Sequence, residues 1–133
     1  MNVMRYVAAA AATFVFIFVF EFLWHGQLLG GLYQATQSLW RPQAEMGTYF
    51  PLIPLYQALL ALVIVFLFTR HCEGKGIGEG VRFGCMIGGL LGIVAASMYV
   101  FMPIPGILAL GWFAGSFIVG LGSGVIASLV YRR

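Results

Sequence analysis

Hydrophobic residues fill four long stretches of this chain, and shorter segments richer in polar residues or proline separate them. The stretches cover residues 4–25, 49–69, 83–103 and 106–131. Each is long enough for a helix to cross the ~30 Å hydrocarbon core of a bilayer. Lipid offers the backbone no hydrogen-bond partners, so apolar runs of this length are expected to be helical. The pattern predicts an all-α membrane protein in which residues 1–133 form one domain of four transmembrane helices.

The first stretch ends in the bulky sequence Glu21-Phe22-Leu23-Trp24-His25. A secretory signal peptide would end in small residues at a cleavage site. We therefore expect the first stretch to be an uncleaved membrane span.

Positive charges are expected to gather on one side of the membrane. Six of the seven Lys and Arg residues would share that side: Arg5, Arg70, Lys75, Arg82, Arg132 and Arg133. The seventh, Arg41, lies between the first two spans. Because short cytoplasmic loops carry an excess of Lys and Arg, both termini and residues 70–82 are predicted to be cytoplasmic. This places Cys72 and Cys85 in a reducing compartment, where we expect neither a disulfide nor, from their spacing with His71, a zinc site.

The composition fits a membrane protein and excludes other classes. Hydrophobic residues make up 62% of the chain and charged residues 8%, against about 25% charged in soluble domains. A protein that binds nucleic acid needs a basic face exposed to water, and the apolar stretches of this chain leave no such face. The lipid bilayer is the expected partner, and the net charge of +3 would add attraction to anionic lipid.

The segment between the first two spans, residues 26–46, has its own pattern. Apolar residues from Leu28 to Trp40 recur at spacings of three and four, which predicts a short amphipathic helix of about three turns lying at the outer interface. Gly30 and Gly31 would bend the chain away from the first span, and Pro42 would end the helix. Two interpretations stay open: a cap over the helix bundle, or a lid over an outward-facing pocket.

Small residues mark the faces where helices are expected to pack. The third span has one such face, formed by Gly84, Gly88, Gly92 and Ala95. The last span has two, formed by Gly111, Gly115 and Gly122 and by Ser116, Gly120, Gly124 and Ala127. Small residues let backbones approach closely in lipid. One face of the last span would serve a helix of the chain; the second would serve either a further helix of the bundle or another subunit, and we favour another subunit.

Four glycines between Arg70 and Arg82 invite comparison with a phosphate-binding loop. The GxxxxGK[ST] spacing is missing and no soluble strand precedes the segment, so that function is not expected. We expect a mobile hairpin with cations facing the lipid surface.

Glu21 and His25 are the focus of the candidate chemistry. They are four residues apart, so they share a helix face and can bond directly. Counted along the first span, Glu21 lies about one turn below the outer boundary of the membrane. Other polar residues are expected at that depth: Tyr56, Gln57, Ser97 and Tyr99. An ionisable residue inside the membrane is a functional hypothesis by default.

Three interpretations of this polar group compete. Glu21, His25 and Gln57 could form a structural hydrogen-bond clamp between helices. Glu21 could exchange protons or bind a cation during transport. Glu21 and His25 could be two ligands of a metal, although two are too few and further residues would have to complete the shell. No pattern of a nucleophile with a base, and no HExxH motif, occurs, so we expect neither an enzyme nor a cofactor.

Several short motifs carry a family resemblance: Trp24-His25-Gly26, Leu39-Trp40-Arg41-Pro42, Glu73-Gly74-Lys75-Gly76, Arg82-Phe83-Gly84 and Pro103-Ile104-Pro105-Gly106. With them the chain resembles small bacterial four-span membrane proteins that have no assigned activity. The resemblance implies a multi-pass protein of the bacterial inner (plasma) membrane.

The length, the four spans and the single glutamate of the first span are also similar to small multidrug exporters. The chain departs from them in three ways: Glu21 is nearer one end, the charge bias is strong, and their motif in the last spans is absent. This likeness is an analogy of fold, which does not fix function.

Two classes of function follow from these patterns. The first is a non-catalytic membrane subunit or binding module that forms a homo-oligomer or docks with another membrane subunit in a larger complex. The alternative is a small proton- or cation-coupled transporter that uses Glu21.

Overall fold

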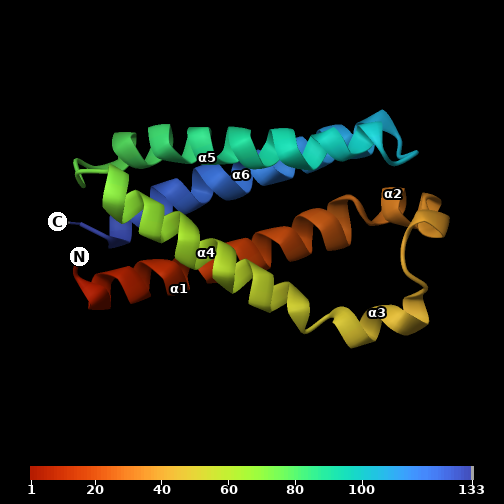
Figure 1. Cartoon of the computed structure of the whole chain (residues 1–133), viewed down its shortest axis with the longest axis horizontal. Coiled ribbons are helices and arrows are strands. Elements are labelled where there is room, and N and C mark those ends of the chain that lie inside the picture. The colour runs from red at the N-terminus through yellow and green to blue at the C-terminus, as the bar shows by residue number, and fades with distance from the viewer. Residues whose placement is uncertain (133) are drawn as a thin grey trace.

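The computed structural model describes residues 1–132, and within that range it contains helices and no strands (Figure 1). Four helical stretches are long and apolar enough to cross a membrane: Val3–Leu28, Leu52–His71, Ile77–Val100 and Gly106–Val130. The predictions of an all-helical chain and of four helices able to span a membrane are confirmed. Arg133, one of the counted cations, lies outside the described residues.

The four long helices are joined by shorter helical pieces. In chain order the elements are α1 (Val3–Glu21), the π-helical segment η1 (Phe22–Leu28), α2 (Gly30–Ala35), the 3₁₀ turn η2 (Gln37–Leu39), α3 (Gln43–Tyr49), α4 (Leu52–His71), α5 (Ile77–Ser97), the 3₁₀ turn η3 (Met98–Val100) and α6 (Gly106–Val130). The first span continues without a break from α1 into η1.

The long helices run between two ends of the molecule (Figure 1). The terminal end holds the start of α1, the α4–α5 connection and the end of α6. There the Asn2 backbone N–H donates to the Tyr131 hydroxyl at 3.1 Å. The cap end holds α2, α3 and η3. Helices α5 and α6 lie side by side, whereas α1 and α4 cross near their middles and diverge toward the cap end (Figure 1).

The contact between α5 and α6 is built on glycine. A Cβ added at Gly84, Gly88 or Gly92 would collide with α6, and one at Gly120 or Gly124 would collide with the backbone of α5. Close approach of two backbones requires the absence of side chains at these positions. The small-residue face of α5 and one of the two on α6 therefore pack against each other.

The second small-residue face of α6 packs on the first span. A Cβ at Gly111 would meet Leu29, one at Gly115 would meet Trp24, and one at Gly122 would meet Phe16. Ser116 is half-buried on the same helix. Both glycine faces of α6 are covered by the same chain. Of the two partners left open for the second face, the structure provides a helix of the bundle, so the preference for another subunit there is wrong.

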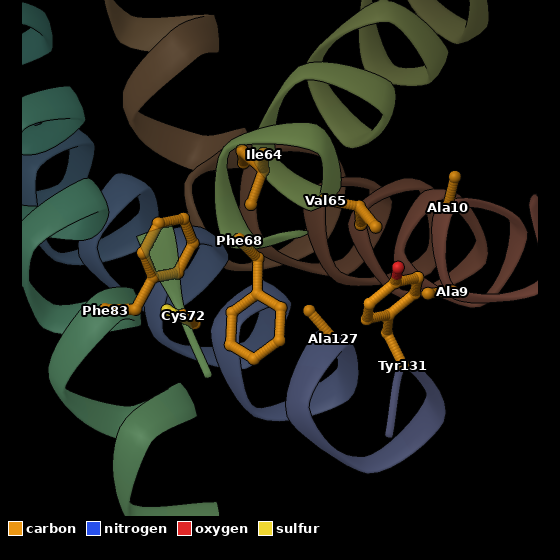
Figure 2. Packing of buried hydrophobic residues seen from close by; sticks show 9 residues of the cluster. All are labelled: Ala9, Ala10, Ile64, Val65, Phe68, Cys72, Phe83, Ala127 and Tyr131. Carbon is orange, nitrogen blue, oxygen red and sulfur yellow. The ribbon is translucent and has the colours of Figure 1, made fainter. Parts of the chain in front are cut away.

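The largest apolar cluster closes the terminal end. Figure 2 shows its side chains arriving from α1, α4, α5 and α6: Ala9, Ala10, Ile64, Val65, Phe68, Cys72, Phe83, Ala127 and Tyr131. The Phe68 and Phe83 rings meet edge to face with centroids 5.5 Å apart. Cys72 is buried in this cluster and Cys85 is half-buried on α5.

Two connections differ from their predicted form. The segment after the first span is not one three-turn helix, because Thr36 and the extended Trp40 interrupt it and leave α2, η2 and α3 as separate pieces. The third span begins at Ile77 rather than near residue 83.

The glycine-rich hairpin is shorter than expected because one carboxylate organises it. The Glu79 side chain accepts the backbone N–H groups of Glu73, Gly74 and Lys75 at 2.6, 2.7 and 2.8 Å. Gly76 has a φ of 110°, a left-handed value that glycine adopts without strain. These contacts let α5 start at once after the turn.

Candidate functional site

A cavity of about 820 Å³ lies at the cap end, where α1 and α4 diverge. Its lining comes from α1 and η1, from the start of α4, and from the lid segment, which we define as residues 30–49 (α2, η2 and α3). The lining residues are Phe18, Glu21, Phe22, His25, Gly26, Tyr33, Trp40, Met46, Phe50, Ile53, Pro54 and Gln57. Most are apolar or aromatic, and the lid interpretation of the segment between the first two spans is the one that this arrangement favours.

The cavity exists because of the residue sizes along α1 and α4. At the crossing, Ile17 and Ala61 are 0% and 1% exposed and pack with Val119 of α6. Alanine lets the helices touch there. Phe18 is the next residue along the chain after Ile17, Phe22 lies a little over one turn nearer the cap end, and both rings line the cavity.

A hydrogen bond between helices lies in the cavity wall. The Gln57 amide Nε2 donates to Glu21 Oε2 at 2.9 Å. Gln57 is only 6% exposed, and its other polar atom, Oε1, is buried without a hydrogen-bond partner among residues 1–132. The wall of the cavity thus contains a carboxylate bonded to a largely buried amide.

His25 takes a different partner from the one expected. Its Nδ1 lies 2.7 Å from the Tyr33 hydroxyl, which also accepts a hydrogen bond from Trp112 Nε1 at 2.7 Å. Because the indole can only donate, we assign the phenol proton to the bond with His25, which makes Nδ1 the acceptor. Burial raises the pKa of the Tyr33 phenol above its usual value, which keeps that proton in place.

Aromatic contacts fix the lid to the bundle. The Tyr33 and Trp40 rings meet edge to face with centroids 5.6 Å apart, and Trp40 lies 6.1 Å from Trp112 of α6. Trp40 Nε1 donates to the Thr36 hydroxyl at 2.9 Å. The lid is therefore held from the α6 side, while its Trp40 and Tyr33 side chains face the cavity.

The π-helical segment η1 sets the direction of the side chains at the top of the first span. Its wider turn places Trp24 toward α6, where Nε1 donates to the Gly111 carbonyl at 2.9 Å. His25 follows toward the lid. Isolated π-helical turns are uncommon and occur often at functional sites.

Some of the predicted site residues come together and others do not. Glu21, His25 and Gln57 line the cavity. Tyr56 is 65% exposed and lies outside the lining. Ser97, whose hydroxyl donates to the Val94 carbonyl at 2.7 Å, and Tyr99 are exposed on the α5 side of the molecule.

The metal interpretation lacks ligands. Glu21 and His25 line one cavity, but within residues 1–132 no three His, Cys, Asp or Glu side chains gather closely enough to hold an ion. Glu21 bonds to Gln57 and His25 to Tyr33, so their side chains are already engaged in other interactions.

Sequence reasoning missed several lining residues and one support. Phe22, Met46, Phe50 and Pro54 line the cavity, and Trp112 orients Tyr33 from α6. Trp112 is the sole tryptophan of the last span, and a buried indole needs an acceptor. The Trp112 indole therefore indicated that a hydrogen-bond acceptor lies near it, but it did not identify that acceptor as Tyr33.

No family model, curated protein or solved structure matches this chain. Its function has to be argued from its own residues.

Proposed function

We propose that the protein is a non-catalytic membrane binding module that holds a largely apolar molecule in the cavity at the cap end. The observation that carries this proposal is the cavity itself, with about 820 Å³ of space. Ligand pockets in proteins measure about 300–1,000 Å³ and combine apolar walls with a few convergent polar groups. The pair of Glu21 and Gln57 supplies those groups here.

The closed terminal end favours binding over passage. Below the crossing of α1 and α4, the cluster around Phe68 and Val65 fills the space between the helices, and these residues are 1% and 0% exposed. A molecule entering at the cap end would meet this cluster. The cavity therefore supports a site with one entrance.

Proton- or cation-coupled transport is the second candidate, and the placement of Glu21 favours it. A carboxylate lines the cavity within the first span, where ionisable residues often lie on ion pathways. This function requires the terminal-end cluster to open during each cycle. Proton flux in proteoliposomes, compared for the natural protein and Glu21→Gln, tests it; absence of flux in both removes transport.

The distribution of cations supports an orientation with both termini in the cytoplasm and the lid at the outer interface. Arg5 donates to the backbone carbonyl of Arg132, and together with Arg70 they line one pocket at the terminal end. At the cap end Arg41 stacks on the Tyr49 ring, 4.2 Å from its centroid. The bias toward the terminal end follows the positive-inside rule, and the family resemblance points to a bacterial inner membrane.

Accessible cysteines test this orientation. In a background without Cys72 and Cys85, Gln37→Cys should react with an impermeant reagent from outside and Lys75→Cys only from inside. Both positions are exposed. The reverse labelling pattern would overturn the orientation.

The module would act as a subunit of a larger membrane assembly or as a homo-oligomer. Purification in mild detergent followed by native mass measurement gives the number of copies and any stoichiometric partner. A lone monomer of 14.5 kDa would contradict the subunit role and leave the binding role.

A matched pair of substitutions tests binding. Diphenylhexatriene (DPH), an uncharged apolar rod, should form a one-to-one complex seen by native mass spectrometry. Ile53→Trp places a larger ring in the cavity and should weaken that complex about tenfold, because the ring takes space that the ligand needs. Leu55→Trp is its control, since Leu55 is similarly exposed on α4, at 50% against 48%, but does not line the cavity. Equal binding by both variants would contradict the proposed site.

A further inference from the structure

The Gln57 side chain has an acceptor that the protein leaves unused. Its Nε2 donates to Glu21, but its Oε1 is buried and has no hydrogen-bond partner among residues 1–132. Buried polar atoms in native proteins are nearly always paired, and an exception needs an explanation. Gln57 lines the cavity and is 6% exposed. A donor on a bound molecule would pair Oε1 if the amide turned this atom toward the cavity.

The Glu21 carboxylate beside it also lacks a basic partner. None of the twelve residues that line the cavity is Lys or Arg. Arg41, which lies at the cap end, stacks on the Tyr49 ring instead. The nearest ionisable base of the lining is His25, whose Nδ1 is engaged by Tyr33. Two acceptors, one of them a carboxylate, thus lie together without a protein cation.

Aromatic rings surround this pair. Phe18 and Phe22 line the cavity from the first span and Phe50 lines it from the connection to α4, while Tyr33 and Trp40 line it from the lid. The faces of aromatic rings carry negative potential and attract cations, most strongly where water is excluded. The same rings offer apolar surface to a hydrocarbon body.

We propose that the ligand of this cavity is a lipophilic amine in its protonated form, with an apolar body and an ammonium group at one end. The ammonium N–H groups would donate to Glu21 and, with the Gln57 amide turned toward the cavity, to its Oε1, and the body would lie along the aromatic walls. This inference rests on the proposed binding function and names the chemical class of its ligand. Charge-assisted hydrogen bonds are the stronger ones, so the head group should decide affinity.

A series of probes with one shared chain separates the contributions of charge and donor. Dodecylamine carries both, dodecyltrimethylammonium carries charge without an N–H, dodecanol carries a neutral donor, and dodecanoate carries the opposite charge. Each is titrated against the DPH complex of the full chain below its micelle concentration, with displacement followed by native mass spectrometry. We expect dodecylamine to displace DPH at about one tenth of the dodecanol concentration, with dodecyltrimethylammonium between them and dodecanoate weakest.

Two variants assign the preference to its residues. Glu21→Gln should bring dodecylamine and dodecanol to within about threefold of each other while DPH still binds, because the charge is lost and the shape kept. Glu45→Gln is the control: Glu45 is exposed on α3 and does not line the cavity, so the preference should persist. Gln57→Leu should reduce the advantage of dodecylamine over dodecyltrimethylammonium, since that difference reports the N–H contact.

The outcomes are distinct. If DPH binds but dodecanol or dodecanoate competes as well as dodecylamine, the amine proposal is overturned and the binding function stands. If Glu45→Gln removes the preference as fully as Glu21→Gln, the amine is attracted to the surface and the proposal is again overturned. If DPH does not bind at all, both proposals are wrong. The comparison of probes on the natural protein holds even where a variant folds poorly.

Discussion

The α5–α6 pair and the α1–α4 pair are both antiparallel helix pairs of similar length, yet one is sealed and the other is open. Between α5 and α6, glycines let the backbones touch from Gly80 and Gly124 at one end to Gly92 and Phe113 at the other. Between α1 and α4, close contact runs from the terminal end to the region around Ala61, and a cavity of about 820 Å³ lies beyond it. The difference teaches that side-chain size along the line of contact, rather than overall hydropathy, decides whether two apolar helices close.

The two pairs also divide the work of stability and binding. The glycine contact can hold α6 rigidly, because interdigitated backbones have little room to adjust. On that helix, the Trp112 indole donates a hydrogen bond to the Tyr33 hydroxyl, and the Gly111 carbonyl accepts one from the Trp24 indole. The α5–α6 pair thus provides a rigid support to which the first span and the lid are hydrogen-bonded.

The largest effect is expected from breaking the sealed pair. Gly88→Leu or Gly120→Leu should lower stability by about 3 kcal/mol or more, because a side chain would replace a backbone contact. Gly89 is the matched control, since nothing lies within 4 Å of a Cβ placed there; Gly89→Ala should raise stability by up to about 1 kcal/mol through helix propensity. Leu90→Ala, at a site 62% exposed, should change it by less than about 0.5 kcal/mol.

Melting curves in detergent measure these differences. Equal curves for Gly88→Leu and Gly89→Ala would show that the α5–α6 contact does not depend on small residues. The order of the two effects, rather than their absolute size, is the decisive result.

A smaller effect is expected at the polar link of the open pair. Glu21→Ala should lower stability by about 1–3 kcal/mol, because the buried Gln57 amide would lose its acceptor. Glu21→Gln should melt close to the natural protein, since an amide oxygen can accept the same hydrogen bond. An unchanged melting curve for Glu21→Ala would remove the clamp role, and the carboxylate would then serve the ligand alone.

The smallest effect is expected at the support of the lid. Trp112→Phe keeps an aromatic ring but removes the N–H that Tyr33 accepts, so global stability should fall by only about 1 kcal/mol. Backbone amides of α2 should then exchange with deuterium faster, while those of α5 should not change. Tyr56→Phe is the control, because that residue is exposed and lies outside the cavity lining. Unchanged exchange in α2 for Trp112→Phe would show that the lid is held by other contacts.

Different parts of the structure were predictable to different degrees. The four spans followed from the length of the apolar runs, since lipid leaves the backbone few alternatives. The glycine faces of α5 and α6 followed from helical spacing, but which face would meet which helix did not, because both are equally small. The second face of α6 packs against the first span, at Trp24 and Phe16. That pairing depends on the order in which the helices surround α6. Residue spacing along the chain carries no information about that order.

The sequence predicted the main polar residues of the candidate site but not their hydrogen-bond partners or all of its lining. Glu21, His25 and Gln57 were recognisable because polar residues are conspicuous in apolar helices. Their pairing was not, because the bond of His25 to Tyr33 depends on the path of the lid, and the sequence suggested one continuous helix there. Ser97 and Tyr99 were grouped with them by depth alone, and depth does not say on which side of the bundle a residue lies.

The π-helical segment at residues 22–28 makes the chain unusually sensitive to insertions and deletions at one place. A π-helical turn holds about one residue more than an α-helical turn. Removing one residue here, such as the exposed Leu23, would let the segment become an ordinary α-helix and rotate its later residues by about 100° relative to α1. Glu21 and His25 could then no longer both face the cavity, although length, hydropathy and membrane insertion would hardly change. In a set of related sequences, strict conservation of length across this segment, rather than of its residues, would be the mark that selection acts on the site.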